Sequence, residues 1–423
     1  MNPTKSRRQF LQSSGALLLG AAATSSRISA AQSAPTNHLK SAIADEDYWA
    51  MVRAQFSFSE SSIPMNAANL CPSFRSVTET VDLLTADIDR DCSFNNRSKF
   101  NELLARSRRL VAAQLNVSAD EIALVRNTSE ANNIVNNGLQ LKPGDEILLW
   151  DQNHPTNNVA WDVRAARFGL TINKVSTPRN PASTAELVDS FTSQFNSRTS
   201  VLALTHVSNL SGIKLPIAEL VTAAHARGIY VHVDGAQVWG AMDLDLKSLD
   251  VDSFSASAHK WYMGPKEVGL LYVKDSNIDR IWPSVIAPGW GNDVDTSLVG
   301  ARKFESLGQR DDAALAALGV AAVLHDNIGA QRIEDRIVQL AQRLKHGIAG
   351  LGQELVTPMN PQFSFGVCII NAAIGQGGTV SNRLYTEHGI AAAATGGVRL
   401  CPTIYNTIEH IDRAVAAIEA LMS

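Results

Sequence analysis

The sequence has few cysteines and little net charge. Its 423 residues include four cysteines, none in a Cys-x-x-Cys pair, and no spacing of cysteine and histidine suggests a zinc site. We expect Cys71, Cys92, Cys368 and Cys401 to be buried or partly buried thiols. The sequence does not determine whether any two of them form a disulfide. The net charge of −4 gives no electrostatic basis for binding nucleic acid or an anionic membrane.

The sequence also lacks an apolar run long enough to span a bilayer. One short run, residues 15–23, follows Arg7-Arg8-Gln9-Phe10-Leu11 and precedes the small residues Ser29-Ala30-Ala31. A basic start, an apolar core and a small-residue site predict a cleaved secretory signal over residues 1–31, and the paired arginines resemble the twin-arginine (Tat) export signal. A short buried helix or a membrane anchor is the alternative. We therefore expect Tat-translocase export to the periplasm, with no membrane anchor.

From about residue 121 onward, short apolar runs alternate with segments of helical spacing. Strands are predicted at 121–126, 146–150, 171–175, 200–205, 228–233, 251–256 and 269–273. Such alternation predicts an α/β fold with a mostly parallel sheet that is covered by helices on both faces. The chain is too long for one ordinary core. We expect a large domain over 65–300, a smaller C-terminal domain over 301–423, and a segment 32–64 that packs with the smaller one.

Side chains able to do chemistry follow two of these strands. Lys260 ends the run Ser257-Ala258-His259-Lys260, and Asp234 follows the strand at 228–233, three residues before Gln237. In open α/β sheets, ligands bind at the carboxyl ends of the strands. Pyridoxal phosphate (PLP) chemistry requires at least a lysine that can form a Schiff base and an acid that can pair with a pyridinium nitrogen.

Four blocks in this order resemble the class V aminotransferase family of fold-type I PLP enzymes, which includes the cysteine desulfurases and isopenicillin N epimerase-like proteins. The blocks are Arg126-Asn127-Thr128-Ser129-Glu130, Thr205-His206-Val207-Ser208-Asn209-Leu210-Ser211-Gly212, His232-Val233-Asp234-Gly235-Ala236-Gln237 and Ser257-Ala258-His259-Lys260. The resemblance extends from about Pro64 to the C-terminus. It implies a mostly parallel seven-stranded sheet, a smaller α/β C-terminal domain, PLP as cofactor and a homodimer.

The resemblance assigns a role to each candidate residue. Lys260 would be the Schiff-base lysine that also moves a proton at the substrate Cα, and Asp234 would keep the ring nitrogen protonated. Arg399 would hold a substrate carboxylate through its planar fork. The implied cofactor contacts are Thr128, Ser129, Ser257 and His259 at the phosphate, His154 stacked on the ring, and Asn209 and Gln237 near the phenolate oxygen. For Thr128 and Ser129, a position that opens a helix independently suits a phosphate.

The sequence departs from the family pattern at two places. After Gly308, where one subunit reaches the phosphate of the other, the family usually has threonine and this chain has Gln309. The desulfurases carry a nucleophilic cysteine on a loop before the last arginine, but residues 387–398 contain none, and Cys401 lies after Arg399. A sulfur-transfer mechanism of the desulfurase kind is therefore not expected.

These observations predict a PLP enzyme that acts on a primary amine. Transamination, epimerisation and β-elimination share the same first steps, and the sequence leaves the choice among them open. Because metabolic amino-acid pools are cytoplasmic, an exported enzyme fits a secreted product or a peptide better. Tat-exported members of the family resemble the periplasmic enzymes that modify the glutamate side group of the siderophore pyoverdine. The alternative of another class is a non-enzymatic binding protein on the same fold.

Overall fold

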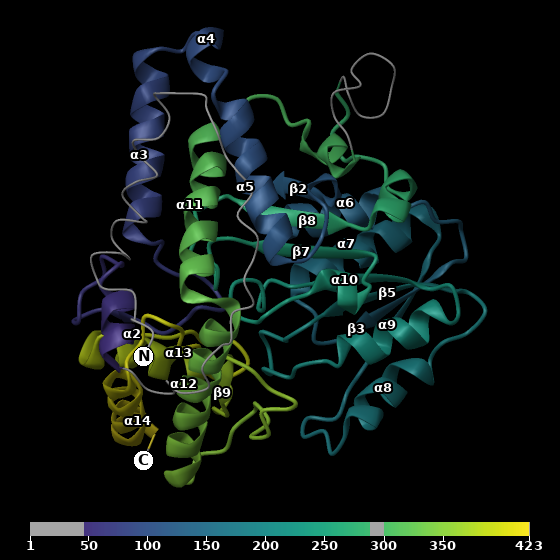
Figure 1. Cartoon of the computed structure of the whole chain (residues 1–423). Coiled ribbons are helices and arrows are strands. Elements are labelled where there is room, and N and C mark those ends of the chain that lie inside the picture. Colours follow the sequence, from purple (N-terminus) through teal and green to yellow (C-terminus); the bar gives the residue numbers. More distant parts are fainter. Residues whose placement is uncertain (1–45, 288–299, 423) are drawn as a thin grey trace, which may run out of the picture.

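A computed structural model describes residues 46–287 and 300–422. The predicted export signal at 1–31 lies outside the described residues. Seven strands form the main sheet in the order β2-β8-β7-β6-β5-β3-β4 (Figure 1). Their bounds are β2 (Ile122–Val125), β3 (Glu146–Trp150), β4 (Thr171–Val175), β5 (Thr199–Thr205), β6 (Tyr230–Asp234), β7 (Ser253–Ser257) and β8 (Gly269–Val273). Only β8 runs antiparallel to its neighbours, which confirms the predicted seven-stranded, mostly parallel sheet.

Both faces of the sheet are covered, and successive strand residues enter opposite cores. On β5, Leu202 and Leu204 face one apolar cluster while Val201 and Ala203 face the other. Helices α8 (Thr184–Thr192) and α9 (Ile217–His225) cover the first face, and α6 (Thr128–Gly138) and α7 (Pro155–Phe168) cover the second. Burial on both faces explains why the strands read as continuous apolar runs. Polar side chains that serve a ligand are consequently found at the ends of the strands.

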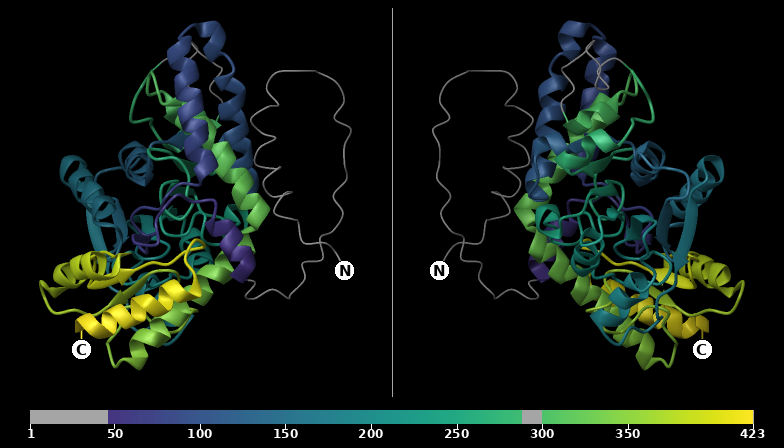
Figure 2. Two further views of the ribbon diagram at one scale, coloured as in Figure 1. Left: turned by 90° about the vertical axis from the view of Figure 1, so that its left-hand side faces the viewer. Right: turned by 90° about the vertical axis from the view of Figure 1, so that its right-hand side faces the viewer.

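Three long helices pack together beside the sheet: α3 (Arg75–Arg90), α5 (Phe100–Gln114) and α11 (Asp312–Ile328). The short helix α4 (Phe94–Arg97) lies between α3 and α5 in the chain. In Figure 2, α3 and α5 stand at the end of the molecule away from α13 and α14. Ser107 of α5 donates to the carbonyl of Ala316 at 3.1 Å and accepts from Gly319 N at 3.0 Å, so α5 and α11 lie in close contact.

The predicted domain boundary near residue 300 stays a prediction. The packing places α11 with α3 and α5 of the large part, and the chain turns by 77° at Gly329 into α12 (Ala330–Gly350). The smaller part then contains α12, β9 (Cys368–Ile370), α13 (Gln376–His388), β10 (Ile390–Ala391), β11 (Val398–Leu400) and α14 (Ile408–Met422). Strand β9 is three residues long and pairs antiparallel with β11.

The described part of the N-terminal segment lies against the smaller part. Strand β1 (Ile63–Pro64) pairs in parallel with β10, and Ile63 joins the apolar cluster between α12 and α14. From α2 (Glu46–Arg53), Glu46 forms an ion pair at 2.6 Å with the buried Arg336 of α12. The remaining short elements are η1 (Ala119–Glu121), α10 (Leu246–Leu249), η2 (Asp275–Arg280) and η3 (Gly300–Glu305).

Within residues 46–287 and 300–422, no single helix is long and apolar enough to cross a membrane. The pair α11 and α12 meets that test together by length and composition, with the bend between them.

The close approach of β6 and β7 gives a test of the packing. A Cβ added at Gly235, just after β6, would lie 1.8 Å from Cζ of Phe254 on β7. We expect Gly235→Ala to lower the free energy of unfolding by about 1–3 kcal/mol, because the ring has to move within a filled core. Gly350→Ala on α12 is the control, since a Cβ there meets nothing within 4 Å. Chemical denaturation of both variants measures the difference, and equal stabilities would contradict the packing described.

Candidate active site

Asp234 is the last residue of β6 and lies at the carboxyl edge of the sheet, 2% exposed. Each carboxylate oxygen has a fixed donor. Asn132 Nδ2 of α6 donates to Oδ2 at 2.9 Å, and the backbone N–H of Ala236 donates to Oδ1 at 3.0 Å. A buried carboxylate needs such donors because it has lost its water. The two hydrogen bonds fix its plane and leave lone pairs free toward the open edge.

Lys260 lies in the turn that follows β7. Burial lowers the pKa of its ammonium group, the nearby charge of Asp234 opposes that shift, and the charge of Arg399 adds to it. No hydrogen bond of Lys260 Nζ occurs within the described residues. The amine is therefore closer to its neutral, nucleophilic form than a solvated lysine is.

His154 caps the N-terminus of α7, where its Nδ1 lies 2.7 Å from Thr156 Oγ1. Its pKa is lowered, first by burial and then by the charge of Lys260, while Asp234 acts in the opposite direction. The charge of Arg399 also reaches it. Four predicted residues from four elements are thus close enough to interact: Lys260, Asp234, His154 and Arg399.

The first turn of α6 and the end of β7 meet at a second group of donors. Thr128 N donates to Ser257 Oγ at 2.8 Å, and the two hydroxyl oxygens lie 2.6 Å apart. Asn127 caps the helix by accepting from Glu130 N, and Ser129 occupies the same first turn. The helix dipole and the paired hydroxyl groups of Thr128 and Ser257 make this end suited to a phosphate. His259 lies next to Lys260, and burial lowers its pKa to about 4.

Gln237 and Asn209 are both buried at this edge. Gln237 Nε2 donates to the carbonyl of Ala68 at 3.1 Å, and its Oε1 accepts from Trp261 Nε1 at 2.8 Å. These partners fix the orientation of the amide and leave it one further hydrogen to donate. Asn209 contributes its backbone carbonyl, which accepts from Arg399 Nη1 at 3.1 Å.

Arg399 lies on β11, a strand the sequence did not indicate, and its guanidinium is buried. Besides the bond to Asn209, its Nη2 donates to Asn66 Oδ1 at 3.0 Å. Its Nε is buried with no partner in the described part of the chain. Asn66 comes from the loop after β1, so a residue far away in sequence holds this arginine.

Gln309 lies apart from the other predicted residues within one chain. It is exposed, and its Oε1 accepts from Arg97 Nη1 at 2.8 Å. Both side chains line an open cavity of about 500 Å³ between α4, α5 and the segment before α11. The contact of Gln309 with the phosphate of a second subunit stays a prediction.

The sequence reasoning did not foresee the orienting roles of three residues around the site: Asn66, Asn132 and His232. Asn132 lies four residues after Thr128, one helical turn into α6, and this spacing was a usable signal. His232 lies two residues before Asp234 on β6, so both side chains point to the same face of the sheet. Asn66 carried no such signal, because its role depends on the packing of β1 beside β10.

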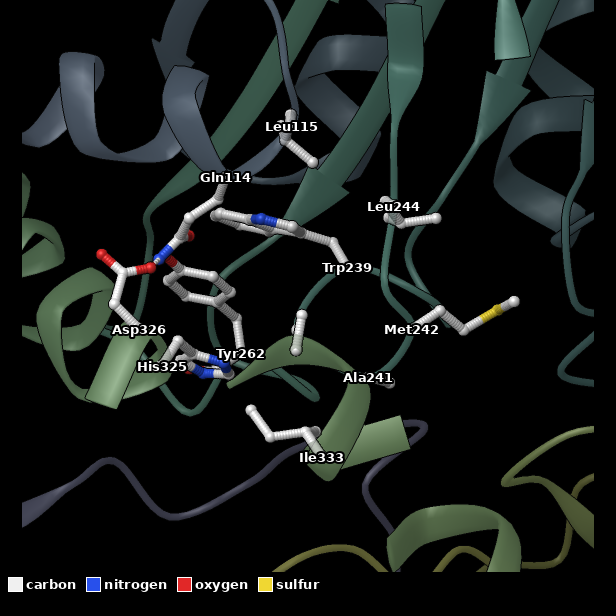
Figure 3. A pocket seen from close by; sticks show the side chains of 12 residues that line it. Gln114, Leu115, Trp239, Ala241, Met242, Leu244, Tyr262, His325, Asp326 and Ile333 are labelled. Carbon is white, nitrogen blue, oxygen red and sulfur yellow. Dashed lines mark hydrogen bonds between the residues drawn. The ribbon is translucent and has the colours of Figure 1, made fainter. Parts of the chain in front are cut away.

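Another cavity, of about 130 Å³, lies behind the turn that carries Lys260 (Figure 3). None of the predicted site residues lines it. Tyr262 is stacked between Trp239, with ring centroids 4.0 Å apart, and His325, at 4.3 Å. His325 Nε2 also lies 2.9 Å from the carbonyl oxygen of Tyr262. This stack holds the chain two residues after Lys260 and restricts where the lysine can point.

Comparison with known proteins identifies the family of this chain. The aminotransferase class-V family profile matches residues 84–414. The chain belongs to the class V aminotransferase family. It is 28% identical over 397 residues to an isopenicillin N epimerase of Streptomyces clavuligerus, covering 90% of this chain and 99% of that protein. It is 31% identical over 329 residues to a cysteine desulfurase of Escherichia coli, covering 72% of this chain and 78% of that protein.

Solved structures show the same fold. A C-DES variant with glycine covalently linked to its PLP cofactor matches with a TM-score of 0.80 at 24% identity, over 87% of this chain and 99% of the other. The apo cysteine desulfurase of Thermococcus onnurineus matches with a TM-score of 0.79 at 24% identity, over 90% and 99%. The fold predicted from the sequence is confirmed.

Membership of the family implies PLP as the cofactor, and the residues present fit it. Lys260 would hold the aldehyde carbon, Asp234 the ring nitrogen, and the first turn of α6 with Ser257 the phosphate. The free lone pairs of Asp234, and the hydroxyl groups of Thr128 and Ser257 at the N-terminus of α6, supply the acceptor and donor pattern that PLP requires. The buried, unpartnered Nε of Arg399 is available to an acidic group beside it.

The lowered pKa of Lys260 predicts how the apoprotein captures PLP. The capture rate should rise with pH as the amine loses its proton and should level off below pH 10.5, the ordinary lysine value. Because the charge of Arg399 lowers that pKa, Arg399→Gln should move the levelling point to higher pH. Stopped-flow absorbance of PLP binding measures both curves. Arg383→Gln, an exposed arginine paired with Glu387, is the control and should match the wild type.

Proposed function

We propose that this protein is an exported PLP enzyme that moves a proton at the Cα of a primary amine or amino-acid group. Transamination is the reaction we favour, and epimerisation and β-elimination are the alternatives on the same site. One observation carries the proposal: the partly buried Lys260 and the buried Asp234 and Arg399 converge at the carboxyl edge of the sheet with His154.

PLP supplies an electron sink when it is bound. The residues of this chain supply position and proton movement. Arg399, held by Asn66 and Asn209, is oriented to grip a carboxylate through its planar fork. Lys260, with its pKa lowered by burial, is an amine that can take a proton from Cα and return it. Burial of these groups excludes water and strengthens each electrostatic contact.

The relatives named above include an epimerase and desulfurases, and the cysteines of this chain argue against sulfur transfer of the desulfurase kind. Cys71 and Cys401 both lie close enough to Lys260 for their charges to interact, yet both thiols are completely buried. Burial raises the pKa of Cys71 to about 12 and also raises that of Cys401. The thiolate is the nucleophile in sulfur transfer. Neither cysteine is therefore suited to that role, and residues 387–398 provide no other.

The proposal also includes export of the protein to the periplasm and its assembly as a homodimer. The paired arginines at 7 and 8 support passage through the Tat translocase to the periplasm. The exposed position of Gln309, away from the Lys260 group of its own chain, supports a homodimer in which it reaches the other subunit. Export favours a secreted substrate, and the glutamate side group of pyoverdine is the specific candidate.

The first test is covalent trapping of the cofactor. Wild-type protein loaded with PLP should keep an absorption band near the visible edge, and borohydride should fix the cofactor on Lys260, as located by peptide mass mapping. Lys260→Ala should lose both the band and the biological activity. The control is Lys142→Ala, a lysine of the turn between α6 and β3. Unchanged biological activity of Lys260→Ala would favour the non-enzymatic binding protein.

Product analysis then separates the reactions. Formation of a 2-oxo acid, with the amino group passed to an added oxo acid, marks transamination. Solvent deuterium at Cα without an oxo acid marks epimerisation, and loss of a β-substituent marks elimination.

The siderophore candidate has its own test. Deleting the gene in a pyoverdine-producing strain that carries it should change the masses of secreted pyoverdine, because the glutamate side group would stay unmodified. Restoring the wild-type gene should restore the masses, whereas the Lys260→Ala gene should not. A secreted mass profile that the deletion leaves unchanged would remove pyoverdine as the substrate and leave the enzyme assignment in place.

A further inference from the structure

A buried polar chain runs beneath Asp234, between α6 and the strands β6 and β7. Asn132 Nδ2 donates to Asp234 Oδ2 at 2.9 Å. Asn132 Oδ1 lies 2.9 Å from His232 Nε2 and is also hydrogen-bonded to Ser255 Oγ. His232 Nδ1 in turn lies 2.8 Å from Ser253 Oγ. All five side chains are buried, and the exposure of Asn132 is 2%.

The directions of these hydrogen bonds follow from the chemistry of the groups. Burial lowers the pKa of His232 to about 3, so the imidazole is neutral and carries one proton. If that proton were on Nδ1, Nε2 would be an acceptor facing the oxygen of Asn132. Turning the amide of Asn132 over would instead set its oxygen against the carboxylate of Asp234. Only one assignment satisfies every group: Ser253 donates to His232, His232 and Ser255 donate to Asn132, and Asn132 donates to Asp234.

The strands fix this chain in register. His232 pairs with Ser253 and Asp234 pairs with Ser255 across β6 and β7, so the four side chains stand on one face of the sheet under α6. The amide of Asn132 cannot rotate without leaving two donors unsatisfied in a buried place, which is costly.

We propose that Asn132 is the positioning residue for Asp234, and that the hydrogen bonds from His232 and Ser255 hold it in the one orientation that donates to this carboxylate. This inference rests on the proposed function, in which Asp234 pairs the ring nitrogen of PLP. With Oδ2 bound by Asn132 and Oδ1 by Ala236, the carboxylate plane is set before the cofactor arrives. The result is a preorganised acceptor for the ring nitrogen.

Asn132→Asp tests the donor without a change of size. At about pH 6 the new carboxyl group can stay protonated, accept from His232 and Ser255, and donate its own proton to Asp234 in place of the amide. As the pH rises that proton is lost, and two carboxylates then face each other in a buried place. We expect the ratio of mutant to wild-type Kd for PLP to rise by about 10-fold or more between about pH 6 and pH 9. The pH dependence of the absorption band of the bound cofactor should change with it.

Three further variants show whether a change in PLP binding comes from the donor at position 132. Asn137→Asp makes the same change at an exposed position of α6 and should give a ratio that is flat with pH. Asn132→Ala removes the donor and should weaken PLP binding at every pH. Ser255→Ala removes one of the two donors to Asn132 and should cause a smaller, pH-independent loss; it also decides the case if Asn132→Asp fails to fold. The charges of Lys260 and His154 interact with that of Asp234, and the charge of Arg399 interacts with those of Lys260 and His154. These three residues are the same in every variant, so their effect on the Kd for PLP is common to mutant and wild type and cancels in the ratio of the two.

Two failures are distinguishable. Wild-type protein that does not bind PLP on Lys260 would overturn the proposed function. The positioning role alone would be overturned if the wild type binds PLP and the Kd ratio of Asn132→Asp to wild type stays flat with pH. It would also be overturned if Asn132→Ala or Ser255→Ala binds PLP as tightly as the wild type does.

Discussion

The site depends on one constraint: the carboxylate of Asp234 is buried at the end of β6 and needs hydrogen-bond donors in place of water. Asp234 meets this constraint with a side-chain donor from α6 and a backbone donor from the turn. Because a buried polar group without partners is costly, these two hydrogen bonds offset the loss of water around the carboxylate. The position of α6, and hence of its phosphate-binding first turn, is tied through Asn132 to the same carboxylate.

The surroundings of Lys260 lower the pKa of its ammonium group. Lys260 has charged neighbours of both signs, and burial outweighs the attraction of Asp234, so its pKa falls. The stacked rings of Trp239, Tyr262 and His325 hold the turn behind it (Figure 3). The pKa of the lysine is thus set by its local surroundings rather than by its sequence position.

The smaller part of the chain completes the site from a distance. Arg399 is placed by β11, and the loop after β1 supplies Asn66 to hold it. The same loop provides the carbonyl of Ala68 that fixes Gln237 and the N–H of Cys71 that binds the carbonyl of His259 at 2.8 Å. This loop, near the start of the described chain, therefore connects Arg399 with the turn that carries Lys260. Its position follows from the pairing of β1 with β10.

The residue pattern alone predicted the mostly parallel sheet and drew attention to Lys260 and Asp234, because apolar runs, helical spacing and the residues that end strands are local features. Arg399 was implied only by the family resemblance, since no local pattern indicated the strand that carries it. Tertiary structure decided which long-range partners orient those groups: Asn132 and His232 beneath Asp234, Asn66 beside Arg399, and α11 with the larger part of the chain. Such partners are set by packing between elements far apart in sequence, and no local pattern records the hydrogen bonds that packing creates.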